Sequence, residues 1–135
     1  MKKRHAAVLT LALAAGPLWG LMPPGPVQSA RAAEPAVSFK DDVLPIFMVH
    51  CAACHAPGGE GTVASGLDLT SYKGVMKGTK FGPMVVPGAT ESSNLMRLLD
   101  WRASPQLRMP HGKQQLPIGE RTTIRRWIQQ GAKDN

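Results

Sequence analysis

Two cysteines and a histidine stand close together in the run Cys51-Ala52-Ala53-Cys54-His55. On a helical turn, residues i, i+3 and i+4 share one face, so both thiols and the imidazole point to the same side. Cys-x-x-Cys-His is the attachment pattern of c-type haem, in which the thiols form thioethers along one edge of the porphyrin. We therefore predict one covalent haem c on Cys51 and Cys54, with His55 as the proximal iron ligand.

The same side chains also occur in three other kinds of site: a redox dithiol, a zinc site and a structural disulfide. A thioredoxin-like dithiol needs a strand–helix–strand context, which the sequence lacks. A zinc site would recruit His50, His55 or His111 beside the cysteines, but the regular second ligand pair of structural zinc sites is missing. A disulfide between the two cysteines would close a very small loop and add little stability. The pattern favours haem over all three.

The opposite face of the iron also needs a ligand, and Met109 is our candidate. It lies in the turn Arg108-Met109-Pro110-His111-Gly112, well downstream of the cysteines and before the last expected helix. Methionine–histidine ligation raises the reduction potential, which suits an electron carrier. Met84 beside Pro83 is an alternative distal ligand, and His111 is another that would give bis-histidine ligation. Methionine also serves as ordinary core packing, which is the competing interpretation of Met109.

The N-terminal residues predict export. Lys2, Lys3 and Arg4 precede an apolar run from Ala6 to Ala15, and Ala30-Arg31-Ala32 offers a small-x-small cleavage pattern. We expect a signal peptide over residues 1–32 and a periplasmic location. An uncleaved membrane anchor is the alternative, although the run is shorter than the roughly 20 apolar residues of a spanning helix.

The charge argument changes once this segment is set aside. The formal net charge is +7 for the whole chain, and it falls to +3 without Lys2, Lys3, Arg4 and Arg31. Export and this modest charge argue against a nucleic-acid partner. We expect redox proteins as partners, which would dock through an acidic surface onto a rim of basic side chains near the haem edge. The candidate rim residues are Lys73, Lys77, Lys80, Arg97, Arg102 and Lys113.

The elements that must position the site are expected to be helical, in one small domain over 38–132 with a mobile lead-in at 33–37 and a tail at 133–135. Apolar spacing predicts a helix over 42–54, opened by Asp41 or Asp42, and another over 120–130, ended by Gly131. Shorter helices are expected at 71–77 and after Ser92 or Ser93. The glycine-rich segments 56–66 and 78–88, and residues 103–117, predict loops.

The sequence also predicts where two tryptophans and a histidine lie. Trp127, with Ile128, is expected to pack against the N-terminal helix or the haem. Trp101 is expected in the core, or with its indole N–H on a haem propionate. His50 is expected at the periphery, because His55 already supplies the ligand.

The chain resembles the planctomycete-type cytochrome c module, a variety of the class I cytochrome c fold. The resemblance spans about residues 38–132 and is carried by Phe39 with Asp42-Val43-Leu44-Pro45-Ile46-Phe47, the Cys-x-x-Cys-His run, Gly66-Leu67-Asp68-Leu69, Gly82-Pro83, Val86-Pro87-Gly88, Met109-Pro110, Trp127-Ile128 and Gly131-Ala132. It implies haem c on Cys51 and Cys54, His55 as proximal ligand, Met109 as distal ligand, and terminal helices that pack across each other.

These observations together predict an exported monohaem c-type cytochrome that transfers single electrons between periplasmic redox partners and is not an enzyme. No acid, base or nucleophile constellation accompanies the motif. Two alternatives stay open at this point. If Met109 does not bind iron, the protein would be an open-site haem protein, either a gas sensor or peroxidase-like. It could also be the cytochrome subunit of a periplasmic dehydrogenase.

Overall fold

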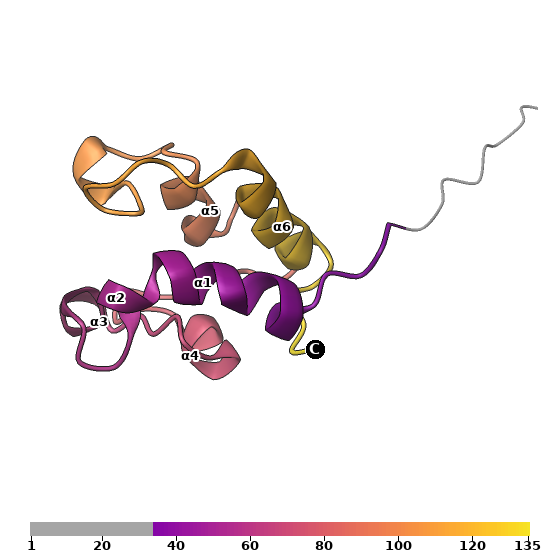
Figure 1. The fold of residues 1–135 in the computed structure, drawn as a ribbon, viewed down its shortest axis with the longest axis horizontal. Coiled ribbons are helices and arrows are strands. Elements are labelled where there is room, and N and C mark those ends of the chain that lie inside the picture. Colours follow the sequence, from indigo (N-terminus) through magenta and orange to yellow (C-terminus); the bar gives the residue numbers. More distant parts are fainter. Residues whose placement is uncertain (1–33) are drawn as a thin grey trace, which may run out of the picture. The chain divides into compact units, whose positions relative to one another are not determined.

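The computed structural model describes residues 34–135, and the predicted signal peptide over 1–32 lies outside this range. The regular structure between residues 34 and 135 is helical without a β-strand (Figure 1), as predicted. None of the helices in this part of the chain is long and apolar enough to cross a membrane. The elements are η1 (Phe39–Val43), α1 (Leu44–His50), α2 (Ala52–His55), α3 (Glu60–Ser65), α4 (Tyr72–Lys77), α5 (Asn94–Leu99), η2 (Pro105–Leu107) and α6 (Ile118–Gln129).

The N-terminal helix begins earlier than the sequence suggested. Ser38, rather than Asp41 or Asp42, is the N-cap, and its hydroxyl accepts a hydrogen bond from the Asp41 N–H at 3.1 Å. The Asp42 carboxylate reaches back to accept from the Ser38 N–H at 2.8 Å, so these two side chains satisfy the backbone donors of Asp41 and Ser38. The predicted continuous helix is divided at Cys51, whose φ of −120° separates α1 from α2.

The segment before this helix was expected to be a mobile lead-in, but it lies against the end of α6. Val37 is buried, and its N–H donates to the Gln130 side chain at 2.7 Å. The same side chain donates to the Pro35 carbonyl at 3.0 Å. One glutamine therefore binds this segment through two main-chain groups. No local pattern predicts this contact, because the two partners lie more than 90 residues apart in sequence.

The C-terminal helix ends as predicted. Gly131 follows α6 with a φ of +101°, the left-handed conformation that glycine adopts without a Cβ penalty. Its N–H donates to the Ile128 carbonyl at 3.0 Å, and the Ala132 N–H donates to the Trp127 carbonyl at 2.9 Å. These bonds satisfy carbonyls that the helix end would otherwise leave unpaired.

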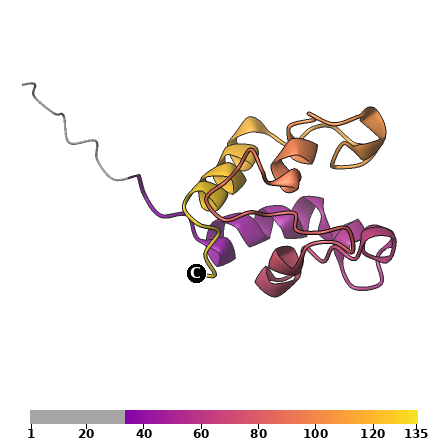
Figure 2. The ribbon, with the colours of Figure 1, turned by 180° about the vertical axis from the view of Figure 1, so that it is seen from behind.

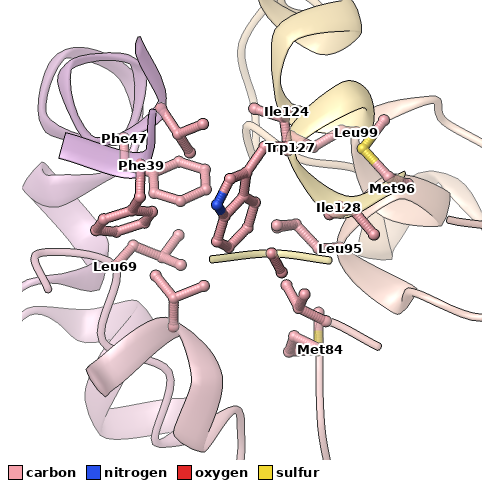
Figure 3. Packing of buried hydrophobic residues seen from close by; sticks show 14 of the residues in the cluster. Phe39, Phe47, Leu69, Met84, Leu95, Met96, Leu99, Ile124, Trp127 and Ile128 are labelled. Carbon is pink, nitrogen blue, oxygen red and sulfur yellow. The ribbon is translucent and has the colours of Figure 1, made fainter. Parts of the chain in front are cut away.

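The N- and C-terminal helical segments pack against each other around Trp127, as predicted. The Trp127 ring lies 5.3 Å from the Phe39 ring and 6.4 Å from the Tyr72 ring, measured between centroids. Figure 3 shows Trp127 between the aromatic side chains of the N-terminal segment and the apolar side chains of α5 and α6. Seen from behind in Figure 2, α5 lies beside α6. This core holds together the elements that surround the site.

Two elements are present where irregular loops were expected, helix α3 and the single-turn helix η2, which lies within residues 103–117. Helix α3 forms within the glycine-rich segment 56–66, with Gly59 and Gly66 at its two caps and only Gly61 inside it. Gly66 ends the helix with a φ of +82°. The other short helices confirm the prediction, since α4 covers 72–77 and α5 carries Leu95 and Met96. The α5 N-cap is Ser93, yet its hydroxyl donates to the Ala89 carbonyl instead of capping the helix.

Candidate haem site

A cavity of about 830 Å³ opens between the helices that carry the cysteines and the segment that follows α5. This volume falls within the roughly 300–1,000 Å³ of sites that hold drug-sized ligands and cofactors. Its walls come from three parts of the chain, residues 50–69, 79–84 and 94–113. Many of the lining side chains are apolar, among them Leu67, Leu69, Met84, Leu95, Leu98, Leu99 and Met109.

Cys51, Cys54 and His55 all line this cavity, so the structure brings the three motif residues to one site. The turn between α1 and α2 places them, because the Cys54 and His55 N–H groups both donate to the Cys51 carbonyl, at 3.1 Å and 2.9 Å. Both thiols are free. Within residues 34–135, no three histidine, cysteine or acidic side chains gather as a metal site would require, so the zinc alternative finds no support there.

The His55 imidazole is oriented by a main-chain group. Its Nδ1 lies 3.2 Å from the Leu67 carbonyl oxygen, which can only accept, so Nδ1 carries the proton. Nε2 is then the nitrogen left with a lone pair for a metal, the arrangement usual for metal-binding histidines. The Leu69 N–H donates to the His55 carbonyl at 2.9 Å, which ties the same residue at its backbone.

Gly61 of α3 is a site residue that sequence reasoning missed. A Cβ at this position would lie 2.8 Å from His55 Cε1 and 3.0 Å from His55 Nε2. Any residue larger than glycine at this position would push the imidazole from its present place. A glycine inside a short helix was the available signal, but without the position of His55 it pointed only to a loop.

All three candidate distal ligands line the cavity, so the structure does not separate them by location alone. Met84 is buried, and its carbonyl accepts from the Leu95 N–H at 2.9 Å. His111 is exposed, and Met109 is half-buried. Met109 is the one held at both main-chain groups, with its N–H on the Leu98 carbonyl at 3.3 Å and its own carbonyl accepting from the Trp101 indole at 3.1 Å.

Burial raises the pKa of the Cys51 thiol to about 11. The charges of Glu120 and Cys54 act in the same direction, and Lys113 opposes them. Reactive dithiols instead have thiol pKa values lowered toward or below neutrality. Cys51 is therefore fully protonated at neutral pH, which argues against the thioredoxin-like alternative.

Residues 51–111 match the model of a known family, described as Planctomycete cytochrome C. The matched segment begins at Cys51 and contains His55, Met84, Met109 and His111. The chain contains a planctomycete cytochrome c domain. No curated protein and no solved structure matches the chain.

The residues of this cytochrome c domain fit a covalent haem. Two free thiols and a histidine with a bound Nδ1 face a largely apolar cavity of suitable volume. Cys51 and Cys54 would hold the porphyrin, and His55 would bind its iron. When bound, the haem supplies one-electron redox chemistry, whose potential depends on the axial ligands and on burial.

Two expectations about nearby side chains are resolved differently. Trp101 uses its indole N–H on the Met109 carbonyl, so that donor is not free for a propionate. His50 lines the cavity, where its Nε2 lies 3.0 Å from a Glu120 carboxylate oxygen. This contact joins the end of α1 to the first turn of α6.

The predicted basic rim divides into three groups. Arg97 and Lys113 line the cavity and are exposed. Lys80 lies 5.2 Å from the centroid of the Phe81 ring, and that ring is itself part of the cavity wall. Arg102 pairs with Glu91 at 2.5 Å instead, and neither Lys73 nor Lys77 lines the cavity.

Proposed function

We propose that this cytochrome c domain is a monohaem electron carrier with His55 and Met109 as the two axial iron ligands. The supporting observation is that both side chains line one apolar cavity although they come from separate parts of the chain. An iron bound from both sides has no position for a substrate, so the protein exchanges electrons without catalysing a reaction of its own.

The first test is the absorption spectrum of the protein produced with cytochrome c maturation, oxidised and reduced. The proposal predicts sharp reduced bands and a weak far-red band in the oxidised form that Met109→Ala removes. Met84→Leu is the matched control, because it also replaces a methionine of the cavity wall, and it should keep the band. Loss of the band in Met84→Leu but not in Met109→Ala would reassign the ligand.

Carbon monoxide binding distinguishes a carrier from an open-site haem protein. The reduced wild type should resist carbon monoxide at neutral pH, and Met109→Ala should bind it readily, because the variant leaves one axial position free. Rapid binding to the wild type would favour a gas sensor or a peroxidase-like enzyme. His111→Ala tests whether His111 is the distal ligand instead. With Met109 as the ligand, this variant should keep the wild-type spectrum, and a changed spectrum would favour bis-histidine ligation.

We further propose that the domain works outside the cytoplasm, following the signal peptide predicted over residues 1–32, and docks onto acidic redox partners. The exposed cations Arg97 and Lys113 at the cavity support this choice of partner. Complementary charge speeds encounter, and salt screens it. The rate of electron transfer to an acidic acceptor should therefore fall as ionic strength rises, and it should fall less steeply in Lys113→Gln. An electron-transfer rate that does not change with salt would contradict the docking proposal. Co-purification of the chain with a larger enzyme at low salt would instead indicate a dehydrogenase subunit.

A further inference from the structure

The turn that carries Met109 is fastened to the end of α5 and not only to its own loop. The Met109 N–H donates to the carbonyl of Leu98, which lies in α5, at 3.3 Å. The Met109 carbonyl accepts from the indole N–H of Trp101, two residues beyond α5, at 3.1 Å. The α5 helix therefore sets the position of Met109 along the cavity wall, although residues 100–108 separate the two in sequence.

The backbone of Trp101 adopts an uncommon conformation. Its φ is +57°, in the left-handed region that bulky residues seldom enter. Such a conformation persists only where the surrounding structure imposes it. Here the Trp101 N–H donates to the Leu98 carbonyl at 3.2 Å, the same oxygen that receives the Met109 N–H. The turn brings the indole back toward Met109.

Two further contacts restrain Trp101, one at the indole ring and one through the residue that precedes it. The Arg108 guanidinium lies 5.4 Å from the centroid of the Trp101 ring, a distance at which a cation is attracted to an aromatic face. On the other side along the chain, Asp100 precedes Trp101 and is bound by Arg121 and Arg125 of α6. Trp101 is thus fixed relative to both α5 and α6 before it reaches Met109.

We propose that Trp101 is a positioning residue for the distal ligand, whose indole N–H holds the Met109 main chain at the cavity and so opposes the departure of Met109 from the iron. This inference rests on the proposed function, in which Met109 is an axial ligand. Removing one such hydrogen bond should favour the detached state of Met109 by about five-fold.

Competition by imidazole measures this detachment directly. Oxidised, haem-loaded wild type, Trp101→Phe and Met109→Ala are titrated with imidazole. Binding is followed in all three by the shift of the main haem absorption band, and in the wild type and Trp101→Phe also by the loss of the far-red band. Trp101→Phe keeps a ring but lacks the N–H, so its apparent Kd for imidazole should be about five-fold lower than that of the wild type. Met109→Ala has no distal ligand to displace, so its tighter imidazole binding sets the lower limit of the Kd.

Two controls separate positioning from general loosening. Gln115→Leu removes a different hydrogen bond to α5, from the Gln115 side chain to the Leu99 carbonyl at 2.9 Å. Trp127→Phe removes an indole N–H bonded to the Lys133 carbonyl at 2.9 Å, in the core. Both should retain the wild-type affinity for imidazole. An equal gain in either control would show that lost stability, not lost positioning, causes the effect.

The outcomes distinguish the inference from the function on which it rests. Wild-type affinity in Trp101→Phe, with tight binding in Met109→Ala, would overturn the positioning role and leave methionine ligation intact. Equal affinity in wild type and Met109→Ala would overturn both.

A second measurement needs no variant. Hydrogen exchange at the Trp101 indole in the wild type should accelerate when saturating imidazole displaces Met109, while exchange at the Trp127 indole should not. An unchanged Trp101 rate would contradict the proposal.

Discussion

The carboxylate of Asp100 joins α5 to α6, and replacing it tests how firmly the distal wall of the cavity is held. Asp100 is the C-cap of α5, and its side chain is only 10% exposed. It accepts a hydrogen bond from Arg121 Nη1 at 2.8 Å and another from Arg125. Burial alone would raise the pKa of this carboxyl, but the bonds from Arg125 and Arg121 outweigh it and hold the pKa below the ordinary 3.8.

The expected cost of Asp100→Asn follows from these contacts. Breaking a buried ion pair by removing one partner costs roughly 3–5 kcal/mol. The two arginines are 15% and 28% exposed, so water partly solvates them once the carboxylate is gone. We therefore expect the free energy of unfolding to fall by about 2 kcal/mol at pH 7.

The effect should depend on pH with a definite sign. Because the pKa is lower in the folded state, the ion pair contributes fully above the unfolded pKa near 3.8 and is lost as the pH falls further. The difference in unfolding free energy between wild type and Asp100→Asn should thus be constant at neutral pH and shrink below about pH 4. Urea unfolding of the haem-loaded protein, followed by circular dichroism, measures both quantities.

Glu91→Gln is the matched control. Glu91 also pairs with an arginine, Arg102, at 2.5 Å, but its side chain is 74% exposed. An exposed pair contributes little, so this variant should stay within about 0.5 kcal/mol of the wild type. The reasoning is refuted if Asp100→Asn behaves like Glu91→Gln at pH 7, or if its deficit persists undiminished at low pH.

Two further predictions concern the proximal side of the cavity. The first is tested on haem-free Cys54→Ser, in which Cys51 is alkylated by iodoacetamide. The rate should keep rising with pH to about 11 in the folded protein, because burial raises the pKa of the Cys51 thiol, and it should level off near pH 9 in urea. Identical folded and unfolded profiles would contradict this. Gly61→Ala should shift the spectrum of the haem-loaded protein, because the new methyl group would lie 2.8 Å from His55 Cε1. Gly119→Ala in α6 is its control, since no atom lies within 4 Å of the added Cβ, and an equal spectral effect would refute the steric argument.

The parts of the site that sequence could predict are those set by local spacing. Cys51, Cys54 and His55 come together because a single turn brings i, i+3 and i+4 to one side. The C-terminal helix and its stop at Gly131 also follow from local patterns. For these residues, neighbours along the chain are neighbours in space, so the pattern carries the geometry.

The parts that escaped prediction depend on contacts between distant segments. Helix α3 forms although Gly61 lowers its intrinsic helix propensity, and the same glycine leaves room for the His55 imidazole. The sequence favours Met109 over Met84 and His111 as the distal ligand, but their location does not decide among them, because all three line the cavity. The hydrogen bonds that Met109 donates to Leu98 and accepts from Trp101 distinguish it from the other two candidates, and no local pattern encodes them.

Both candidate iron ligands are held by groups that do not titrate. A main-chain carbonyl, that of Leu67, orients His55, and the Leu98 carbonyl with the Trp101 indole fixes Met109. Neither carbonyls nor the indole N–H change protonation in the neutral range. The charged pair that supports the distal wall, Asp100 with its arginines, loses its charge only at acidic pH, because the Asp100 pKa is lowered. The main-chain anchors of both candidate ligands are therefore insensitive to pH near neutrality, which suits the electron carrier proposed above.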